Sequence, residues 1–424
     1  MKAPAPARVL QPVSTRLPWL LTVSLLGAGC TDRALEEEAR GVPADPGPGP
    51  PEDTPDPEDP LRNAVLEPTT ALQQSGLAGS IVAATPGVRV LVDGHPAAGV
   101  TVGFESQDDY GGAVSVTRAQ TDADGVATAQ TWELGPYHAT YVVVASLPGT
   151  DVEPVEFRAA TTSAFELVLH GAEAFDPQSR EQLDRAVRRW QGAVVNALPS
   201  ISGTLDTFAT TCERQAPGTE VEHRGVHVFV EAEPLLDAAG RGGPCVLRAD
   251  GSPAFGRVTL DAGIVAEYTH EGALESLMIH ELGHVLGVGT LWPDAGLLRD
   301  PASPANPNAD PYFAGAQARA EFEAVRADSG YEGVAIPVED RATLEGSVNS
   351  HWRESVIGSE TMSTSRVSLA LAPPLSSMTI ASLADLGFYT VNLLAADPWR
   401  LPVASLQEGN TTSSSFGCEP FAIP

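Results

Sequence analysis

Two histidines and a glutamate within residues 274–289 have the spacing of a zinc hydrolase site. His280 and His284 lie four residues apart in the run LESLMIHELGHVLGVG, so a helix would project both imidazoles from one face, one turn apart. Glu281 lies beside them. Zinc held by two imidazoles, with water in an open position and a carboxylate nearby, is the H-E-x-x-H arrangement. The sequence therefore predicts one catalytic Zn²⁺ ion, with Glu281 as the general base.

The third protein ligand lies outside this motif, because catalytic zinc usually has three protein ligands and a water molecule. A histidine six residues after the second is one source, but that position holds Thr290. A glutamate from a second helix is another source of the third ligand. The one histidine downstream of the motif is His351, 67 residues after His284. His223 and His227 flank a predicted strand, which would separate them by about 13 Å, so they cannot share one metal ion and we interpret them as structural.

Glycines indicate where the motif helix ends. A left-handed residue after the last helical turn costs little only for glycine, and Gly287 and Gly289 closely follow the second histidine. We expect the helix to begin near His270 or Glu271. The chain then turns away, which leaves room for a third ligand from another segment.

The segment before the motif alternates between strands and a long helix. Residues 165–170, 226–234 and 256–264 are rich in β-branched and aromatic residues and predict strands. Residues 177–197 carry apolar side chains at spacings of three and four, which predicts an amphipathic helix. This order indicates an α+β domain.

Residues 80–162 instead contain several short runs of alternating apolar and polar residues, which predict a β-sandwich. Asp122 and Asp124 could suggest a calcium loop, but no third acidic ligand or closing glutamate follows. We therefore interpret this pair as a hairpin turn. His95 and His138 are interpreted as surface or loop residues.

The motif and the segments after it resemble the leishmanolysin family of metzincin zinc peptidases, and its bacterial members in particular. The resemblance covers roughly residues 165–398. Its specific parts are HELGHVLGVGTLW, a long insertion, SHWRE, SETM and LSSMTIASLADLGFYTVN, in that order. It implies a metzincin-like α+β catalytic domain that hydrolyses peptide bonds.

The resemblance also implies roles for individual residues. His280, His284 and His351 would bind zinc. Glu281 would be the general base and later the proton donor, and Met362 would form the methionine turn beneath the metal.

Other residues near the implied site have competing interpretations. Met378 follows the apolar period of the last helix, so we assign it to the core. Glu354, Glu360 and Asp385 are candidates for replacement ligands or for partners of the ligands. The insertion, residues 291–350, is expected to form a surface subdomain that lines the cleft.

A second resemblance concerns the strand-rich segment. The runs VDGHPAAGVTVGF and TDADGVATAQTWELG look like a bacterial immunoglobulin-like domain of the invasin and intimin type. This resemblance covers about 80 residues and implies an all-β immunoglobulin-like sandwich before the catalytic domain.

The net charge excludes one class of partner. Acidic residues outnumber basic ones by 55 to 25, which gives a formal charge of −30. Such a chain would repel nucleic acid and anionic membrane surfaces. Protein or peptide substrates are expected, and the chain is expected to be a monomer.

The first thirty residues predict export. Basic residues precede an apolar run, residues 17–26, that is too short to span a bilayer permanently. The small residues before Cys30 resemble the lipobox of bacterial lipoproteins, although Gly27 stands where leucine is usual. We expect a cell-envelope lipoprotein anchored through Cys30; secretion with cleavage near Ala28 is the alternative.

Cysteine usage agrees with export. Cys212 and Cys245 have a spacing that suits one disulfide in an oxidising compartment, which would leave Cys418 unpaired. The predicted segments are a signal peptide (1–30), a proline- and acid-rich disordered tether (31–78), the sandwich (79–163), the peptidase domain (164–398) and a C-terminal tail (399–424).

Two functions remain open at this stage. The favoured one is an extracytoplasmic zinc endopeptidase. The alternative is a non-catalytic adhesin or binding protein with a relic peptidase domain, although the intact Glu281 argues against it.

Overall fold

The computed structural model describes residues 60–306, 308–327, 329–341, 347–364, 372–402 and 417–420. The predicted signal peptide, the lipidation site at Cys30, most of the tether and most of the C-terminal tail lie outside the described residues. No helix in the described part is long and apolar enough to cross a membrane.

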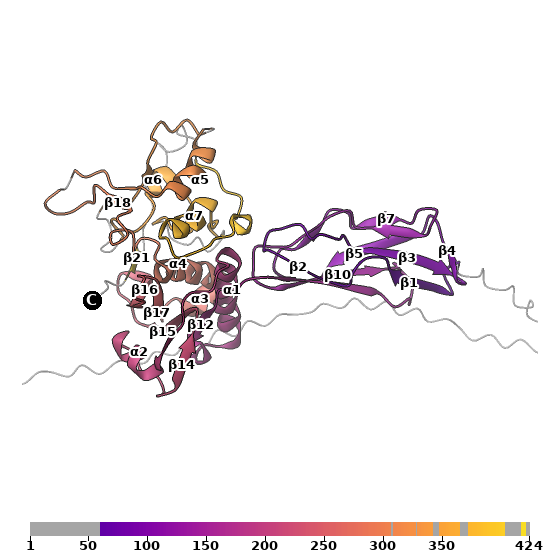
Figure 1. Ribbon diagram of the computed structural model, residues 1–424, viewed down its shortest axis with the longest axis horizontal. Coiled ribbons are helices and arrows are strands. Elements are labelled where there is room, and N and C mark those ends of the chain that lie inside the picture. The colour runs from indigo at the N-terminus through magenta and orange to yellow at the C-terminus, as the bar shows by residue number, and fades with distance from the viewer. Residues whose placement is uncertain are drawn as a thin grey trace, which may run out of the picture. The chain divides into compact units, whose positions relative to one another are not determined.

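Residues 64–161 contain strands but no helix, and two of these strands, within residues 64–76, belong to the segment that the sequence assigned to the disordered tether. They form two larger sheets, one with the order β1-β3-β4 plus β8 on β3, the other with the order β2-β11-β10-β5-β7 (Figure 1). Val90, Phe104, Tyr141 and Phe157 are fully or almost fully buried in one shared core. The strands are β1 (Ala64–Pro68), β2 (Gln73–Gly76), β3 (Gly87–Val92), β4 (His95–Pro96), β5 (Thr101–Ser106), β6 (Ala113–Val114), β7 (Arg118–Gln120), β8 (Val126–Thr128), β9 (Trp132–Glu133), β10 (Thr140–Ser146) and β11 (Val155–Thr161).

The two aspartates between β7 and β8 form a turn. The Asp122 carboxylate accepts hydrogen bonds from the backbone N–H groups of Asp124 and Val126, both at 2.9 Å. These residues therefore form a turn, as expected, but not a hairpin, because β7 pairs with β5 in one sheet and β8 pairs with β3 in the other. His95 is exposed in β4, and His138 lies in the loop before β10.

The chain after the strand-rich region contains a third larger sheet, of five strands. Its order is β12 (Leu167–His170), β15 (Val226–Glu233), β17 (Pro253–Asp261), β16 (Ala238–Leu247) and β21 (Gly417–Pro420). The first three strands are mutually parallel, β16 is antiparallel to β17, and β21 pairs in parallel with β16. Strands and helices alternate along this part of the chain, as its sequence pattern predicts.

Helix α1 (Pro177–Ala193) begins at a well-defined cap. The Asp176 carboxylate accepts hydrogen bonds from the N–H groups of Gln178 and Ser179, and proline occupies the first helical position. The helix ends four residues earlier than predicted, because Val194 is extended and bridges to Val391.

Helix α4 (Leu274–Leu286) carries the zinc motif and is almost wholly buried. It begins at Leu274 and not near 270, because Gly272 takes a left-handed conformation, with φ of 73°, after the short helix α3 (Val265–His270). Gly287, with φ of 113°, ends the helix, and its N–H donates to the carbonyls of Gly283 and His284. The predicted end is confirmed, and the predicted start was wrong.

Glycines in the sheet allow α4 to lie close to it. A Cβ atom added to Gly240 of β16 would lie 2.7 Å from Glu281 Oε1, and one on Gly242 would overlap the Glu281 carbonyl oxygen. On β17, a Cβ at Gly256 would overlap Val285. The backbone of the sheet therefore packs directly against α4. The glycine-rich strand β16 was not predicted as a strand.

The opposite face of the sheet is covered by residues 201–223. They form β13 (Ile201–Thr204), α2 (Leu205–Thr211) and β14 (Glu220–His223). A disulfide joins Cys212, after α2, to Cys245 of β16, with 5.2 Å between Cα atoms. The predicted pairing is confirmed. Cys418 lies in β21, and its side chain is outside the described part.

The segment after the motif contains a small sheet and three helices. The sheet consists of β18 (Leu298–Arg299), β19 (Tyr312–Phe313) and β20 (Ile336–Pro337). The helices are α5 (Ala316–Arg326), α6 (Glu354–Ile357) and α7 (Ser377–Asp385) (Figure 1). The Asp385 carboxylate accepts hydrogen bonds from the N–H groups of Gln317 and Ala318, both at 2.9 Å, so it fixes the start of α5.

Aromatic and charged side chains join the strand-rich region to α1 and α4. The Tyr137 hydroxyl donates a 2.7 Å hydrogen bond to one oxygen of Glu275, and Arg185 of α1 donates to the other at 2.7 Å. The Arg185 guanidinium lies 5.3 Å from the ring centre of Tyr110 and 5.1 Å from that of Tyr137. Glu275 is in the first turn of α4, so this contact reaches the helix that carries the zinc motif.

The glycine contact predicts a local stability effect. Gly242→Ala should lower the free energy of unfolding by about 1–3 kcal/mol, since the added methyl overlaps the α4 backbone. Gly263→Ala is the control, because its Cβ would be no closer than 3.4 Å to Asp261; a change within about 0.5 kcal/mol is expected. Urea denaturation measures both, and equal effects would contradict the close packing of α4.

Candidate metal centre

Three imidazoles converge on one point. The Nε2 atoms of His280 and His284 are 3.1 Å apart, those of His280 and His351 are 3.2 Å apart, and those of His284 and His351 are 3.1 Å apart. Two nitrogens on one tetrahedral zinc ion, each at 2.0–2.1 Å, would lie about 3.3 Å apart. Within the described ranges, this is the one group of three or more such side chains that could hold a metal ion.

Backbone carbonyls fix the protonation of each ring. A carbonyl oxygen only accepts hydrogen bonds, so a ring nitrogen that contacts one carries the proton. The Nδ1 contacts are His280 with Thr361 O at 2.6 Å, His284 with Val288 O at 2.9 Å, and His351 with Ser347 O at 3.2 Å. Each Nε2 then presents a lone pair to the shared point, which is the arrangement of metal-binding histidines. The sequence could not identify these carbonyls as hydrogen-bond partners of the histidines, because every residue has a backbone carbonyl.

Burial keeps these imidazoles neutral. The three side chains are no more than 3% exposed. Desolvation lowers the pKa of His280 to about 4 and is the main cause that lowers the pKa of His351 to about 3. Desolvation, with smaller repulsion from the other two rings, also holds the pKa of His284 well below its ordinary value. The rings are therefore neutral at neutral pH, and each Nε2 is available to bind a cation.

Glu281 lies between the helix and the sheet. Its side chain is fully buried, and the Gly240 position of β16 faces its carboxylate. Because glycine has no side chain, the carboxylate fits between α4 and the strand. Glu281 is adjacent in sequence to His280, so the carboxylate is held within the same rigid helix as two of the imidazoles.

His351 reaches the centre from a loop just before α6. Its carbonyl accepts a 2.9 Å hydrogen bond from Glu339 N, and the next residue, Trp352, donates its backbone N–H to Met362 O at 3.0 Å. The first bond joins His351 to the predicted insertion, and the second joins Trp352 to the segment that contains Met362. The loop is therefore fixed on both sides of the imidazole.

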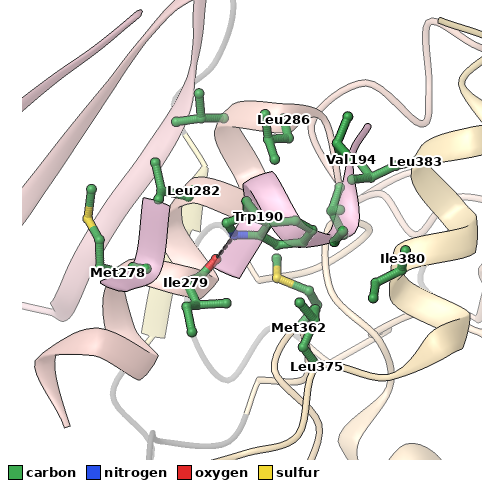
Figure 2. Packing of buried hydrophobic residues seen from close by; sticks show 14 of the residues in the cluster. Trp190, Val194, Met278, Ile279, Leu282, Leu286, Met362, Leu375, Ile380 and Leu383 are labelled. Atoms are coloured by element: carbon green, nitrogen blue, oxygen red, sulfur yellow. Dashed lines mark hydrogen bonds between the residues drawn. The ribbon is translucent and has the colours of Figure 1, made fainter. Parts of the chain in front are cut away.

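Met362 packs against the catalytic helix. A Cβ atom added to Gly283, which precedes His284, would lie 2.6 Å from the Met362 sulfur. Figure 2 shows Met362 beside Trp190, whose indole N–H donates a 2.9 Å hydrogen bond to the Ile279 carbonyl. Trp190 comes from α1, so the methionine and α1 support the same part of α4.

The other candidates near the site have their own partners. The Glu354 carboxylate accepts a 3.1 Å hydrogen bond from Thr364 Oγ1, and Asp385 fixes the start of α5 as described above. Glu360 accepts a 2.6 Å hydrogen bond from Met362 N. None of these carboxylates belongs to the histidine group. Met378 is buried in the core on α7.

A second histidine pair lies in the sheet. His227 of β15 hydrogen-bonds through Nδ1 to His170 Nε2 of the neighbouring strand β12. Their rings are stacked with 4.7 Å between centres. The side chain of His223 is outside the described part. Among the described residues, this pair does not belong to a group of three or more potential metal ligands.

Comparison with known proteins supports the leishmanolysin resemblance. A family model described as leishmanolysin, Peptidase_M8, matches residues 212–404. The matched segment contains the three histidines, Glu281 and Met362, and it begins later than the residue 165 expected from the sequence. Residues 212–404 are thus similar to the leishmanolysin family of metallopeptidases. No match was found among curated proteins.

Solved structures similar to the chain include fragments of intimin. The D00-D0 domain of intimin is 19% identical, with a TM-score of 0.18, and the alignment covers 23% of this chain and 48% of that one. The D0-D1 domain is 20% identical, with a TM-score of 0.17 and coverages of 22% and 45%. A C-terminal 282-residue fragment in complex with the translocated intimin receptor is 14% identical, with a TM-score of 0.19 and coverages of 46% and 54%. The chain spans about half the length of each fragment.

Buried neutral histidines predict a pH-dependent stability of the metal-free protein. The folded-state pKa of His280 lies below the unfolded value of about 6.5, so the unfolded chain takes up the proton first as the pH falls. The stability contribution is complete above pH 6.5 and is lost towards pH 4. Moving from pH 7 to pH 5 should cost about 2 kcal/mol through His280.

The measurement is urea denaturation of chelator-treated protein at the two pH values. His280→Gln should reduce this pH dependence by about that amount. The same substitution at His95, which is exposed in β4, is the control for the loss of a histidine side chain. An identical pH dependence in His280→Gln and wild type would contradict the buried neutral state of this ring.

Proposed function

We propose that this chain is an extracytoplasmic zinc-dependent endopeptidase. The observation that carries the proposal is the convergence of three neutral Nε2 atoms, 3.1–3.2 Å apart, beside a buried glutamate on the same helix as two of them. Three lone pairs that face one another repel, so a cation among them stabilises the arrangement. His280, His284 and His351 would hold that ion.

The donor set favours zinc. Imidazole nitrogen is a common zinc ligand, and three protein ligands leave a fourth position for water, as catalytic sites require. When bound at such a site, zinc lowers the pKa of a water molecule to about 7 and polarises a substrate carbonyl. A structural zinc site would instead fill the fourth position with a cysteine or histidine.

Glu281 is proposed to move the proton. Its carboxylate would accept a proton from the attacking water and then deliver it to the amine nitrogen of the leaving product. The two histidines on α4 keep their geometry because α4 is buried on all sides and supported by the sheet, α1 and Met362. Their Nδ1–H groups stay bonded to carbonyls, so the rings neither rotate nor take up that proton.

The substrate is proposed to be a protein or peptide. The three histidines and Glu281 are at most 3% exposed. An extended peptide can add to a sheet edge through backbone hydrogen bonds. The face of β16 at Gly240 lies against Glu281, and β21 pairs with β16.

The setting is proposed to be outside the cytoplasm. The disulfide between Cys212 and Cys245 ties the segment after α2 to β16, and such bonds persist in oxidising compartments. The proposed lipid anchor on Cys30 agrees with that setting. A relic domain would not need to keep both the histidine geometry and Glu281, so the adhesin alternative is less well supported.

Replacing Glu281 should separate catalysis from metal binding. Purified protein should cleave casein or a quenched peptide library, and a chelator should abolish the cleavage. Glu281→Gln should still bind one zinc ion per chain but lose activity by a factor of about 10²–10⁴, because the proton acceptor is gone. His351→Ala should lose tight zinc binding. Chelator-insensitive cleavage, or full activity in Glu281→Gln, would refute the mechanism.

A further inference from the structure

Glu360 is a buried carboxylate directly before the methionine turn. Its side chain is 1% exposed. A buried carboxyl group that lacks water requires hydrogen bonds. The donors are Met362 N at 2.6 Å, Ser376 N at 3.1 Å, Ser376 Oγ at 2.7 Å and Thr379 Oγ1 at 2.6 Å. Both carboxylate oxygens are thus engaged, and the group has a defined orientation.

One branch of these bonds leads to His280. Thr361 lies between Glu360 and Met362, and its carbonyl accepts the Nδ1–H of His280 at 2.6 Å. The bond from Met362 N to Glu360 Oε2 closes a short turn around Thr361. The carboxylate therefore fixes the backbone group that orients this imidazole.

A second branch leads to the loop of His351. The Thr379 hydroxyl donates to Glu360 and accepts the indole N–H of Trp352 at 2.8 Å. Trp352 follows His351 in sequence, and its backbone N–H donates to Met362 O. An acceptor-only group at position 360 sets the direction of these bonds, since the Thr379 hydroxyl has one proton and gives it to the carboxylate.

We propose that Glu360 is a positioning residue for the metal centre. It holds two of the three imidazoles in place through the Thr361 carbonyl and the Thr379–Trp352 contact. This inference rests on the proposed function. Glu360 itself touches neither the metal point nor the histidines, so it acts only through these neighbours. The role requires a side chain with two oxygens that both accept hydrogen bonds. Glutamine has nearly the same shape, but its NH₂ group donates and cannot accept.

The test compares Glu360→Gln with Glu332→Gln, which makes the same chemical change at an exposed loop position. Zinc affinity is measured by competition with a chelator, and the Co²⁺-loaded protein gives a visible absorption spectrum that reports ligand geometry. Glu360→Gln should bind zinc about 10–100-fold more weakly, with an altered cobalt spectrum, because groups that orient ligands typically have effects of this size. Glu332→Gln should match wild type.

A purely structural role predicts a different result. If Glu360→Gln unfolds at lower urea concentration but keeps wild-type zinc affinity and cobalt spectrum, the inference is wrong. If wild type lacks peptidase activity but the affinity still falls in Glu360→Gln, the proposed function fails and the positioning role stands. If wild type has peptidase activity and Glu360→Gln keeps the wild-type zinc affinity and cobalt spectrum, the proposed function stands and the positioning role fails.

A second pair of variants decides the matter if Glu360→Gln does not fold. Thr379→Val keeps the shape of the buried side chain but removes the hydroxyl that joins Glu360 to Trp352. Thr379→Ser keeps the hydroxyl. We expect weaker zinc binding and a changed cobalt spectrum in Thr379→Val, and recovery in Thr379→Ser. Equal zinc affinity in the two variants would overturn the inference.

Discussion

The bond from each imidazole Nδ1 to a backbone carbonyl is the constraint on which the rest of the site depends. Three buried rings can offer three lone pairs to one point only if every proton is held on the opposite side. The acceptors belong to the turn at Thr361, the end of α4 at Val288, and the loop at Ser347. The position of each of these segments is therefore part of the metal centre.

Close packing provides the rigidity that this arrangement needs. Glycines at 240, 242 and 256 bring the sheet against α4, and Gly283 admits the Met362 sulfur on another side. Trp190 bonds to the α4 backbone, while the strand-rich region bonds to Glu275 in its first turn. Helix α4 thus contacts the sheet, Met362, α1 and the strand-rich region, and burial at the same time desolvates the imidazoles and keeps them neutral.

The sequence predicts local features well and long-range contacts poorly. The spacing of His280, Glu281 and His284 requires only a helix, and Gly287 ends that helix as expected. His351 was identified through the family resemblance, since no local pattern relates it to α4. The start of α4 was wrong because Gly272 separates α3 from it, and β16 was missed because its glycines resemble a loop. Glu360 was noted only as a candidate, since its partners at 376 and 379 come from another helix.

The pairing of β21 with β16 has a further consequence for association between molecules. An uncovered edge strand offers a row of free backbone donors and acceptors to any other chain, and so favours association between molecules. Residues 417–420 pair along that edge of the catalytic sheet. The same few residues that pair beside the catalytic helix therefore also protect the sheet from joining to that of another copy.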